Sequence, residues 1–298
     1  IYNLDYMMNL VALSKKESVS AYHLDKSEMM RQFKEYNIAN KVYNGIKASR
    51  DRGHRIYDSV IVIAFRDRHK ILKINIETLF KQSSNIAIAL VCSNINDLKF
   101  ALKEKKKNRH IFISLAPNYP LGLKWQEGID FCRRSIKSKS LTILGSDDLL
   151  SLNYIKNSMN YIEKKSFDLA GMIKWKIYDS NMRLYDMSYG VGKNILLGGG
   201  KVFSRNILDR CSWDLFDIHK NFHLDEKGYE VVKSAGGKIK TMDDEDFILS
   251  IKGKWEMLNK TEVFLNAPSS AIVYKDITNQ VESTFGSLKI LNYNDIFK

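Results

Sequence analysis

Residues 59–68 read Ser-Val-Ile-Val-Ile-Ala-Phe-Arg-Asp-Arg, a β-branched apolar run that ends abruptly in charged residues. Such a run is typical of a strand that is buried on both faces of a parallel sheet. From Ile71 to Phe80 the apolar residues recur at helical spacing instead. The stretch therefore predicts a strand followed by a helix, which is the repeating unit of an α/β protein.

The same alternation continues along the chain. Apolar runs predict further strands at 86–91, 111–113 and 141–144, and helical patterns lie between them at 98–107 and 123–136. This β-α-β-α order predicts an α/β fold with a mostly parallel sheet flanked by helices. Ligands of such sheets bind beyond the carboxyl ends of the strands, so the residues that follow each strand are the first candidates for a site.

The two flanking parts of the chain have other patterns. Residues 1–57 are polar, with apolar positions at helical spacing, and predict a helical N-terminal extension. The second half is less regular. There we expect strands at 167–173, 175–178 and 238–242, a turn at 181–183, a glycine loop at 198–200, and helices at 202–211 and 226–234.

The composition is that of a compact globular protein. The 298 residues are 44% hydrophobic and 27% charged, and only three prolines argue against long disordered linkers. No apolar run approaches the ~20 residues that cross a bilayer, and no basic-then-apolar leader is visible. The three cysteines lack the spacing of metal ligands and predict free thiols in a reducing compartment. We expect a cytoplasmic protein.

The formal net charge of +13 predicts an anionic partner. Nucleic acid, an anionic membrane surface or a phosphorylated substrate would each be attracted to the basic stretches 99–109 and 133–139. A solvated helix face is the simpler explanation of such lysines. RNA binding would call for exposed aromatic residues or an RNP-type motif beside them, and neither is present. We therefore expect no nucleic acid partner.

Asp147 and Asp148 follow the predicted strand 141–144 almost directly. Like-charged neighbours raise each other's pKa unless a cation or hydrogen-bond donors intervene, so the pair suggests a divalent metal whose shell is completed by phosphate oxygens. The alternative is a turn with a helix N-cap, in which a carboxylate accepts backbone N–H bonds. The position at the carboxyl edge of the sheet favours the metal. Neither a dinucleotide-binding glycine motif nor a P-loop occurs in the sequence.

Five short motifs follow one another in a recognisable order. They are 59–68 with the helix up to Gln82, Asn118-Tyr-Pro-Leu-Gly122 with Gly128, Leu144-Gly-Ser-Asp-Asp-Leu149, Gly198-Gly-Gly-Lys-Val-Phe-Ser204, and Leu224-Asp-Glu-Lys-Gly-Tyr229 with the glycines 236–237. Over residues 58–260 this series resembles the nucleotide-sugar glycosyltransferases of the GT-A fold, family-2 type. The third motif looks like the Asp-x-Asp-Asp metal element of that family, and the fifth is similar to its catalytic-base segment.

The resemblance implies that a sugar is transferred, with inversion, from a nucleoside diphosphate to an acceptor hydroxyl. It implies Mn²⁺ or Mg²⁺ bound through Asp148, with Asp147 on the water shell of the metal or on the ribose. Asp225 or Glu226 would be the general base. The implied substrate contacts are Phe65, Arg68, Asp147, Gly199, Gly200, Lys201 and Trp255.

The sequence departs from the family pattern in two places. Gly145 stands where the family often has the first acid of its metal motif, so we expect Asp148 to carry most of the metal binding. Its loss should then cost more than the loss of Asp147. The acidic run 243–246 competes with Asp225 and Glu226 for the role of base. Asp225 is preferred because it precedes a predicted helix and the following Gly-Gly and strand match the family order.

On this basis the chain divides into an extension 1–57, a nucleotide-sugar-binding half 58–150, an acceptor and base half 151–265 and a C-terminal extension 266–298. We expect a UDP- or GDP-linked donor and a glycan or lipid-linked acceptor in surface-glycan synthesis, such as capsule or lipooligosaccharide, with peripheral contact to an anionic inner-membrane face. Two alternatives stay open. One is a non-catalytic or nucleic-acid-binding basic module, and the other is a sugar-phosphate nucleotidyltransferase, which would carry a glycine-rich loop where this chain has Arg66-Asp-Arg-His69.

Overall fold

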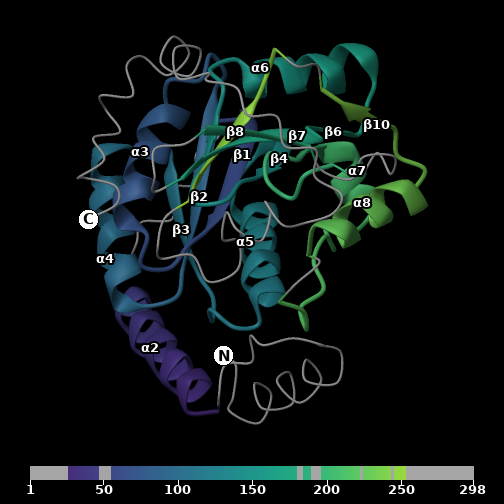
Figure 1. The fold of residues 1–298 in the computed structure, drawn as a ribbon. Coiled ribbons are helices and arrows are strands. Elements are labelled where there is room, and N and C mark those ends of the chain that lie inside the picture. The colour runs from purple at the N-terminus through teal and green to yellow at the C-terminus, as the bar shows by residue number, and fades with distance from the viewer. Residues whose placement is uncertain are drawn as a thin grey trace.

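The computed structural model describes residues 26–46, 55–179, 184–188, 196–221, 224–242 and 245–252. Two β-sheets form its framework (Figure 1). The larger sheet has seven strands in the order β10-β6-β9-β4-β1-β2-β3. Its strands are β1 (Tyr57–Ala64), β2 (Ile86–Cys92), β3 (Ile111–Leu115), β4 (Ser138–Ile143), β6 (Leu169–Gly171), β9 (Val202–Ser204) and β10 (Ile239–Thr241).

Helices follow most of these strands and complete the α/β pattern. They are α2 (Lys26–Gly45), α3 (His69–Leu79), α4 (Ile95–Lys107), α5 (Leu121–Ser135), α6 (Tyr154–Met159) with a π-helical turn after it (Asn160–Lys164), α7 (Arg205–Arg210) and α8 (Leu224–Ser234). Within the described ranges no helix combines the length and the apolar character that crossing a membrane requires.

The centre of the larger sheet is parallel, as the sequence predicted. β1 pairs in parallel with β2 on one side and with β4 on the other, and β2 pairs in parallel with β3. Residues 60–63 of β1 have no exposed surface, which explains their uninterrupted apolar character. The carboxyl ends of these strands meet at one edge, where Asp147 and Asp148 were expected. The mostly parallel sheet flanked by helices is confirmed.

Helices cover both faces of this sheet. Because successive side chains of a strand point to opposite faces, Ile61 and Ile63 pack with residues of α3, α4 and α6. Val60 and Val62 pack with residues of α5, α7 and α8 on the other side. Figure 1 shows α3 and α4 on one side of the sheet and α5, α7 and α8 on the other. The central strands are therefore packed between two hydrophobic cores.

One prediction for the second half is wrong. Residues 202–204 form strand β9, which pairs antiparallel with β4 and β6, and not the beginning of a helix. The helix α7 starts only at Arg205, where the Ser204 hydroxyl accepts a hydrogen bond of 3.1 Å from the Ile207 N–H. Val202 and Phe203 have no exposed surface, so this short apolar pair was selected for burial in the sheet and not for a helix face. The turn expected at 181–183 lies outside the described residues.

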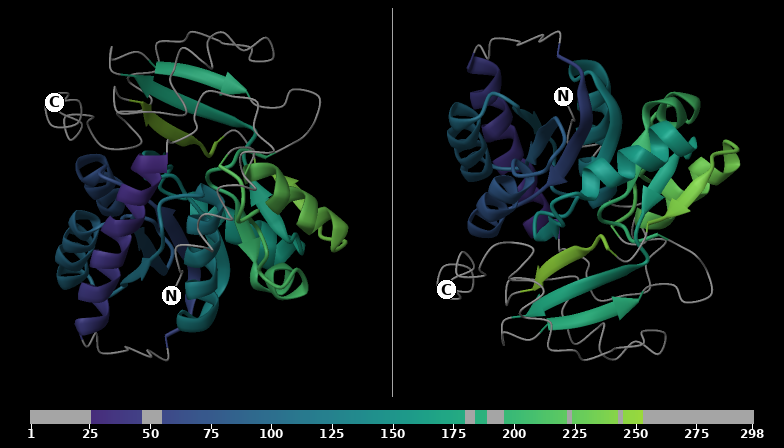
Figure 2. Two further views of the ribbon diagram at one scale, coloured as in Figure 1. Left: turned by 90° about the horizontal axis from the view of Figure 1, so that it is seen from below. Right: turned by 90° about the horizontal axis from the view of Figure 1, so that it is seen from above.

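A second, four-stranded sheet was not foreseen. Its order is β5-β11-β7-β8, and Figure 2 shows it as a layer of its own beside the larger sheet. The strands are β5 (Asp148–Leu150), β7 (Lys174–Asp179), β8 (Leu184–Ser188) and β11 (Ile248–Lys252). β5 begins at the second acid of the pair, so residues near the end of the described chain pair directly with this motif.

The helix α2 lies within the predicted extension 1–57, whereas Tyr57 already belongs to β1. Ala39 of α2 is fully buried within the core that contains Ile61 and Ile63. Polar contacts join the helix to segments at the carboxyl edge of the sheet. They are Tyr43 Oη to Ile113 O at 3.0 Å, Arg66 to Glu35 at 3.1 Å, and Asn118 Nδ2 to Gln32 Oε1 at 3.2 Å.

Candidate functional site

The acid pair lies where the two sheets meet. Asp148 opens β5, and its backbone pairs antiparallel with Ser250 of β11. The Ile251 N–H donates to the Asp147 carbonyl at 2.8 Å, which extends this pairing by one residue. Since side chains alternate along a strand, Ser250 and Lys252 point to the same face of β11. That face is the one that meets the two carboxylates.

Asp147 forms two ion pairs with cations that come from distant parts of the chain. The Lys252 ammonium lies 2.8 Å from one carboxylate oxygen, and both side chains are only 8% exposed. The Arg68 guanidinium lies 3.1 Å from the other oxygen and is 29% exposed. A buried carboxylate requires such partners, because an unpaired charge is very costly away from water.

Asp148 is bound by neutral donors instead. One carboxylate oxygen accepts a hydrogen bond from the Ser250 hydroxyl, and the other accepts one of 3.2 Å from the Gly145 N–H. Burial of the carboxyl, followed by the negative charge of Asp147, raises the pKa of Asp148. The hydrogen bonds from Ser250 and Gly145 act in the opposite direction. Asp148 thus accepts a backbone N–H, as the turn interpretation of the motif would have it.

Gly145 and Gly199 leave the space that the Asp148 carboxylate occupies. A Cβ atom on Gly145 would lie 2.3 Å from an oxygen of Asp148, and one on Gly199 would lie 2.7 Å from the same oxygen. Both contacts are far too short for any side chain. The glycine at 145, where the resembling family often has an acid, is therefore required by the position of Asp148.

The donor atoms at this pair do not suit a divalent cation in the arrangement described. Each of the four carboxylate oxygens is already in an ion pair or a hydrogen bond within the protein. A divalent ion bound to Asp147 would lie beside the positive groups of Arg68 and Lys252 and would be repelled by both. The usual first acid is replaced by Gly145. We therefore derive no chemical step through a metal at this pair.

A second set of metal-ligating groups follows β1. One ligand atom from each of Asp67, His69 and Asp97 lies within 4.8 Å of the others, so the set could hold a metal ion. Asp97, which has no exposed surface, accepts a hydrogen bond of 3.0 Å from the Asp67 N–H and contacts His69 Nε2 at 2.9 Å. Asp67 has a φ of 55°, and this network holds it in that left-handed conformation. The network thereby fixes the turn that carries Arg68.

Phe65 ends the first strand run and lies in the core. It is 2% exposed and packs edge-on against Phe100 and His69 with 6.0 Å between ring centroids. The structure thus gives it the packing role that is usual for an aromatic residue at the end of a buried strand. Its contact with a nucleobase stays a prediction.

The glycine loop before β9 lies against the acid pair. The Gly200 N–H donates to the Ile143 carbonyl at 2.7 Å, and Gly200 has a φ of 77°, which favours glycine. The Gly199 Cα faces the Asp148 carboxylate, as its blocked Cβ position shows. Lys201 is only 2% exposed, so its ammonium is inside the protein and not at the surface.

The structure places the candidate bases in two different surroundings. Asp225 and Glu226 lie in the first turn of α8, which begins two residues earlier than the predicted helix 226–234, and Glu226 is half-buried. Asp246, from the competing acidic run, is 6% exposed and accepts hydrogen bonds of 2.8 Å from both Ser151 and Asn157. This carboxylate joins the segment before β11 to Ser151 and to helix α6, which favours a structural role.

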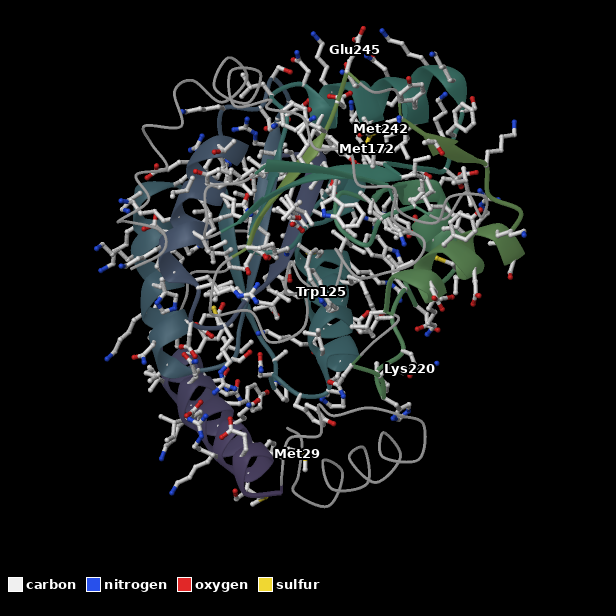
Figure 3. All side chains as sticks on the ribbon, in the orientation of Figure 1. Met29, Trp125, Met172, Lys220, Met242 and Glu245 are labelled. Atoms are coloured by element: carbon white, nitrogen blue, oxygen red, sulfur yellow. The ribbon has the colours of Figure 1, made fainter. Side chains whose placement is uncertain are left out.

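Of the remaining predicted residues, the structure describes only Glu245. Glu245 is exposed, and Figure 3 shows it at the outer edge of the molecule. Residues 243 and 244, and Trp255, lie outside the described residues. The contact of Trp255 with a substrate therefore stays a prediction.

Sequence reasoning missed Ser250 and Lys252 as members of the site. A signal was present, because 248–252 reads Ile-Leu-Ser-Ile-Lys, an apolar strand with polar residues at alternate positions. A lysine in a buried strand requires a buried anion as its partner. The sequence alone could not say that this anion is Asp147, which lies 105 residues earlier.

Lys124 of α5 has its ammonium inside the protein. It is 1% exposed and donates to the Phe65 carbonyl and, at 2.9 Å, to Asn118 Oδ1. Burial lowers the pKa of Lys124 from 10.5 to about 8, while Asp97 opposes this change. Between these two pH values the unfolded chain retains a proton that the folded protein releases, so folding becomes more favourable as the pH rises.

We expect the free energy of unfolding of the wild type, relative to that of Lys124→Met, to rise between about pH 8 and about pH 10.5. The total change should be on the order of 3 kcal/mol, because one pKa unit corresponds to about 1.4 kcal/mol. Urea denaturation of both proteins at several pH values measures it. Parallel pH profiles for the two proteins would contradict this assignment.

No protein-family model matches the sequence, and no curated protein matches it. Solved structures do match. S. aureus TarS superimposes with a TM-score of 0.51 at 12% identity, over 65% of this chain and 36% of TarS. TarS 1–349 in complex with UDP-GlcNAc gives 0.50 at 16% identity, over 67% of this chain and 60% of that one. GalNAc-T7 with UDP, GalNAc and Mn²⁺ gives 0.50 at 14% identity, over 65% and 43%.

This chain therefore covers less than two thirds of each of these three proteins. At such low identities the likeness shows the fold alone. The chain has the GT-A fold that its sequence motifs predicted.

Proposed function

We propose that this protein is a glycosyltransferase that moves a sugar from a nucleoside diphosphate to an acceptor hydroxyl. The observation that carries the proposal is the place of the acid pair. In a GT-A sheet, Asp147 and Asp148 lie just beyond β4 and next to the turn after β1, where open α/β sheets bind their ligands. The structures of TarS and GalNAc-T7 that share the fold contain UDP-GlcNAc and UDP, respectively.

The proposed reaction is a single displacement at the anomeric carbon. The bond from that carbon to the β-phosphate oxygen breaks, and its electron pair stays on the departing nucleoside diphosphate. The acceptor oxygen forms the new bond from the opposite face, and its proton passes to a carboxylate, for which we propose Asp225 or Glu226. This course inverts the configuration of the sugar.

A divalent cation is what the family resemblance implies for the diphosphate. The structure of GalNAc-T7 contains Mn²⁺, and this chain has the Asp67, His69 and Asp97 group that could hold a metal. When bound, such an ion would act as a Lewis acid on the phosphate oxygens. Asp147 and Asp148, which the sequence predicted as its ligands, present oxygens that are already bonded within the protein.

We further propose a UDP- or GDP-linked donor and a glycan or lipid-linked acceptor in surface-glycan synthesis. We also propose a cytoplasmic location with contact to the anionic inner-membrane face, and the net charge of +13 supports that contact, since basic surfaces are attracted to anionic lipids. These finer assignments follow from the resemblance and the charge.

The test is a donor screen that reads released nucleoside diphosphate across common nucleotide sugars. We expect release from one UDP- or GDP-sugar, and a roughly hundredfold lower transfer rate in Asp225→Asn or Glu226→Gln, because general base catalysis is worth about that much. Glu230→Gln, an exposed change on the same helix, is the matched control and should retain the rate. If no nucleotide sugar is bound or cleaved by the folded protein, the proposal is wrong.

A further inference from the structure

The two cations that pair with Asp147 come from different elements of the fold. Arg68 is positioned by the turn after β1, and Lys252 is the last residue of β11. Both reach the same carboxylate, at 3.1 Å and 2.8 Å. Two cations from distant parts of the chain thus converge on one carboxylate, at the edge of the sheet where the proposed diphosphate would bind.

The hydrogen bonds described for the neighbouring acid come from neutral groups, although the charge of Lys252 also acts on it. The oxygens of Asp148 accept from the Ser250 hydroxyl and the Gly145 N–H. A third acid cannot stand at position 145 without displacing Asp148, because its Cβ would lie 2.3 Å from that carboxylate. Compared with the metal motif that it resembles, this site therefore has one acid fewer and a buried lysine more.

We infer that Arg68 and Lys252 bind the diphosphate of the donor and supply the positive charge that a divalent metal would otherwise bring. This inference rests on the proposed function. We call the two residues the diphosphate clamp. As the bond to the anomeric carbon breaks, the electron pair goes to the β-phosphate oxygen, and the guanidinium and ammonium groups stabilise the negative charge there by charge-assisted hydrogen bonds. No oxidant, reductant or further reactant is needed.

The two residues suit this task in different ways. A guanidinium offers several N–H groups in one plane and can bind two phosphate oxygens at once, whereas an ammonium acts as a compact point charge. Asp147 holds both groups in place before the ligand arrives, so little side-chain entropy remains to be lost on binding. In this arrangement Asp147 is a positioning residue, and the clamp residues make the contact.

The experiment measures binding of UDP and of GDP by calorimetry, in EDTA and again with Mn²⁺. We expect the wild-type protein to bind one of them with the same affinity in both buffers. Lys252→Met and Arg68→Met should each weaken that binding by about tenfold or more, as expected for the loss of a hydrogen bond to a charged group. Lys252→Arg, which keeps the charge, should retain most of the affinity.

Lys73→Met is the matched control. It removes the same charge from an exposed side chain of α3 and should leave the affinity unchanged. Because Lys252→Met leaves Asp147 with one partner fewer, the double variant Lys252→Met with Asp147→Asn removes the charges from both members of the buried pair. It should fold and still bind the nucleotide at least tenfold more weakly than the wild type, by the same argument.

Each failure has its own meaning. Binding that requires Mn²⁺ overturns the clamp and leaves the proposed function standing. Unchanged affinity in Lys252→Met and Arg68→Met also overturns it, and Lys252 is then a structural partner of Asp147. A folded wild-type protein that binds neither nucleotide in either buffer overturns both the clamp and the proposed function.

Discussion

Asp147→Ala is expected to lower the free energy of unfolding by about 3–5 kcal/mol, the usual cost of removing one partner from a buried ion pair. The substitution strands the Lys252 ammonium, whose side chain is 8% exposed, without its carboxylate. It also removes the partner of Arg68. Urea denaturation of wild type and variant at neutral pH gives the difference directly.

Glu77→Ala is the matched control for this prediction. Glu77 pairs with Lys73 at 3.8 Å on α3, and both side chains are 54% exposed. Exposed pairs of this kind contribute about 0.5 kcal/mol or less. If Asp147→Ala costs no more than Glu77→Ala, the Lys252 ammonium has water or another anion to replace the carboxylate, and the charge arrangement described here is wrong.

The expected rank of the two acids follows from their partners. The sequence led us to expect that the loss of Asp148 would cost more, because Asp148 was to carry the metal. In the structure Asp147 holds two cations, whereas Asp148 accepts from a hydroxyl and a backbone N–H. For stability we therefore expect Asp147 to be the more important acid. The effect of each on activity remains a prediction that the donor screen tests.

Gly122→Ala is expected to cost about 3 kcal/mol or more, at the upper end of the range for overpacked sites. A Cβ at this position would lie 1.9 Å from the Asp217 carbonyl oxygen and 3.0 Å from that of Lys220. Both are backbone atoms, so no side chain can rotate away. The Gly122 N–H also donates to the Lys220 carbonyl at 2.9 Å, and Figure 3 shows Lys220 near one end of α5.

The control for this substitution is Gly45→Ala. No atom lies within 4 Å of the Cβ position of Gly45, at the end of α2. Alanine there should leave stability unchanged or raise it by up to about 1 kcal/mol, because it favours helix more than glycine does. Thermal unfolding of the two variants side by side separates the steric effect from the general effect of removing a glycine. Equal melting temperatures would show that the start of α5 can move away from residues 217–220.

The first half of the fold could be predicted from the sequence because its signals are local. Each central strand contains a short run of mostly apolar residues, and each following helix has an apolar face, so the local pattern locates them. The position of Asp147 beyond β4 follows from that order. β9 was missed because three residues, Val202 to Ser204, are too few to show a period, and their strand pairing depends on β4 and β6.

The partners of the acid pair could not be predicted for a different reason. The pairing of β5 with β11 joins residues about a hundred positions apart, and the sequence of neither segment indicates which strand it pairs with. A lysine at 252 has the same sequence signature whether it faces water or a buried carboxylate. Only the three-dimensional arrangement reveals that Arg68 and Lys252 both form ion pairs with Asp147.

Because β11 is the last described strand in the chain, it is synthesised after the acid pair with which it pairs. A ribosome releases Asp147 and Asp148 long before Ser250 and Lys252, so a nascent chain that has already formed β1, β2 and β4 still has an acid pair that lacks two of its donors. The first 150 residues would therefore carry an unfinished edge until translation has passed residue 252. A fragment that stops short of β11 should depend on chaperones, whereas the chain through Lys252 contains both of these donors.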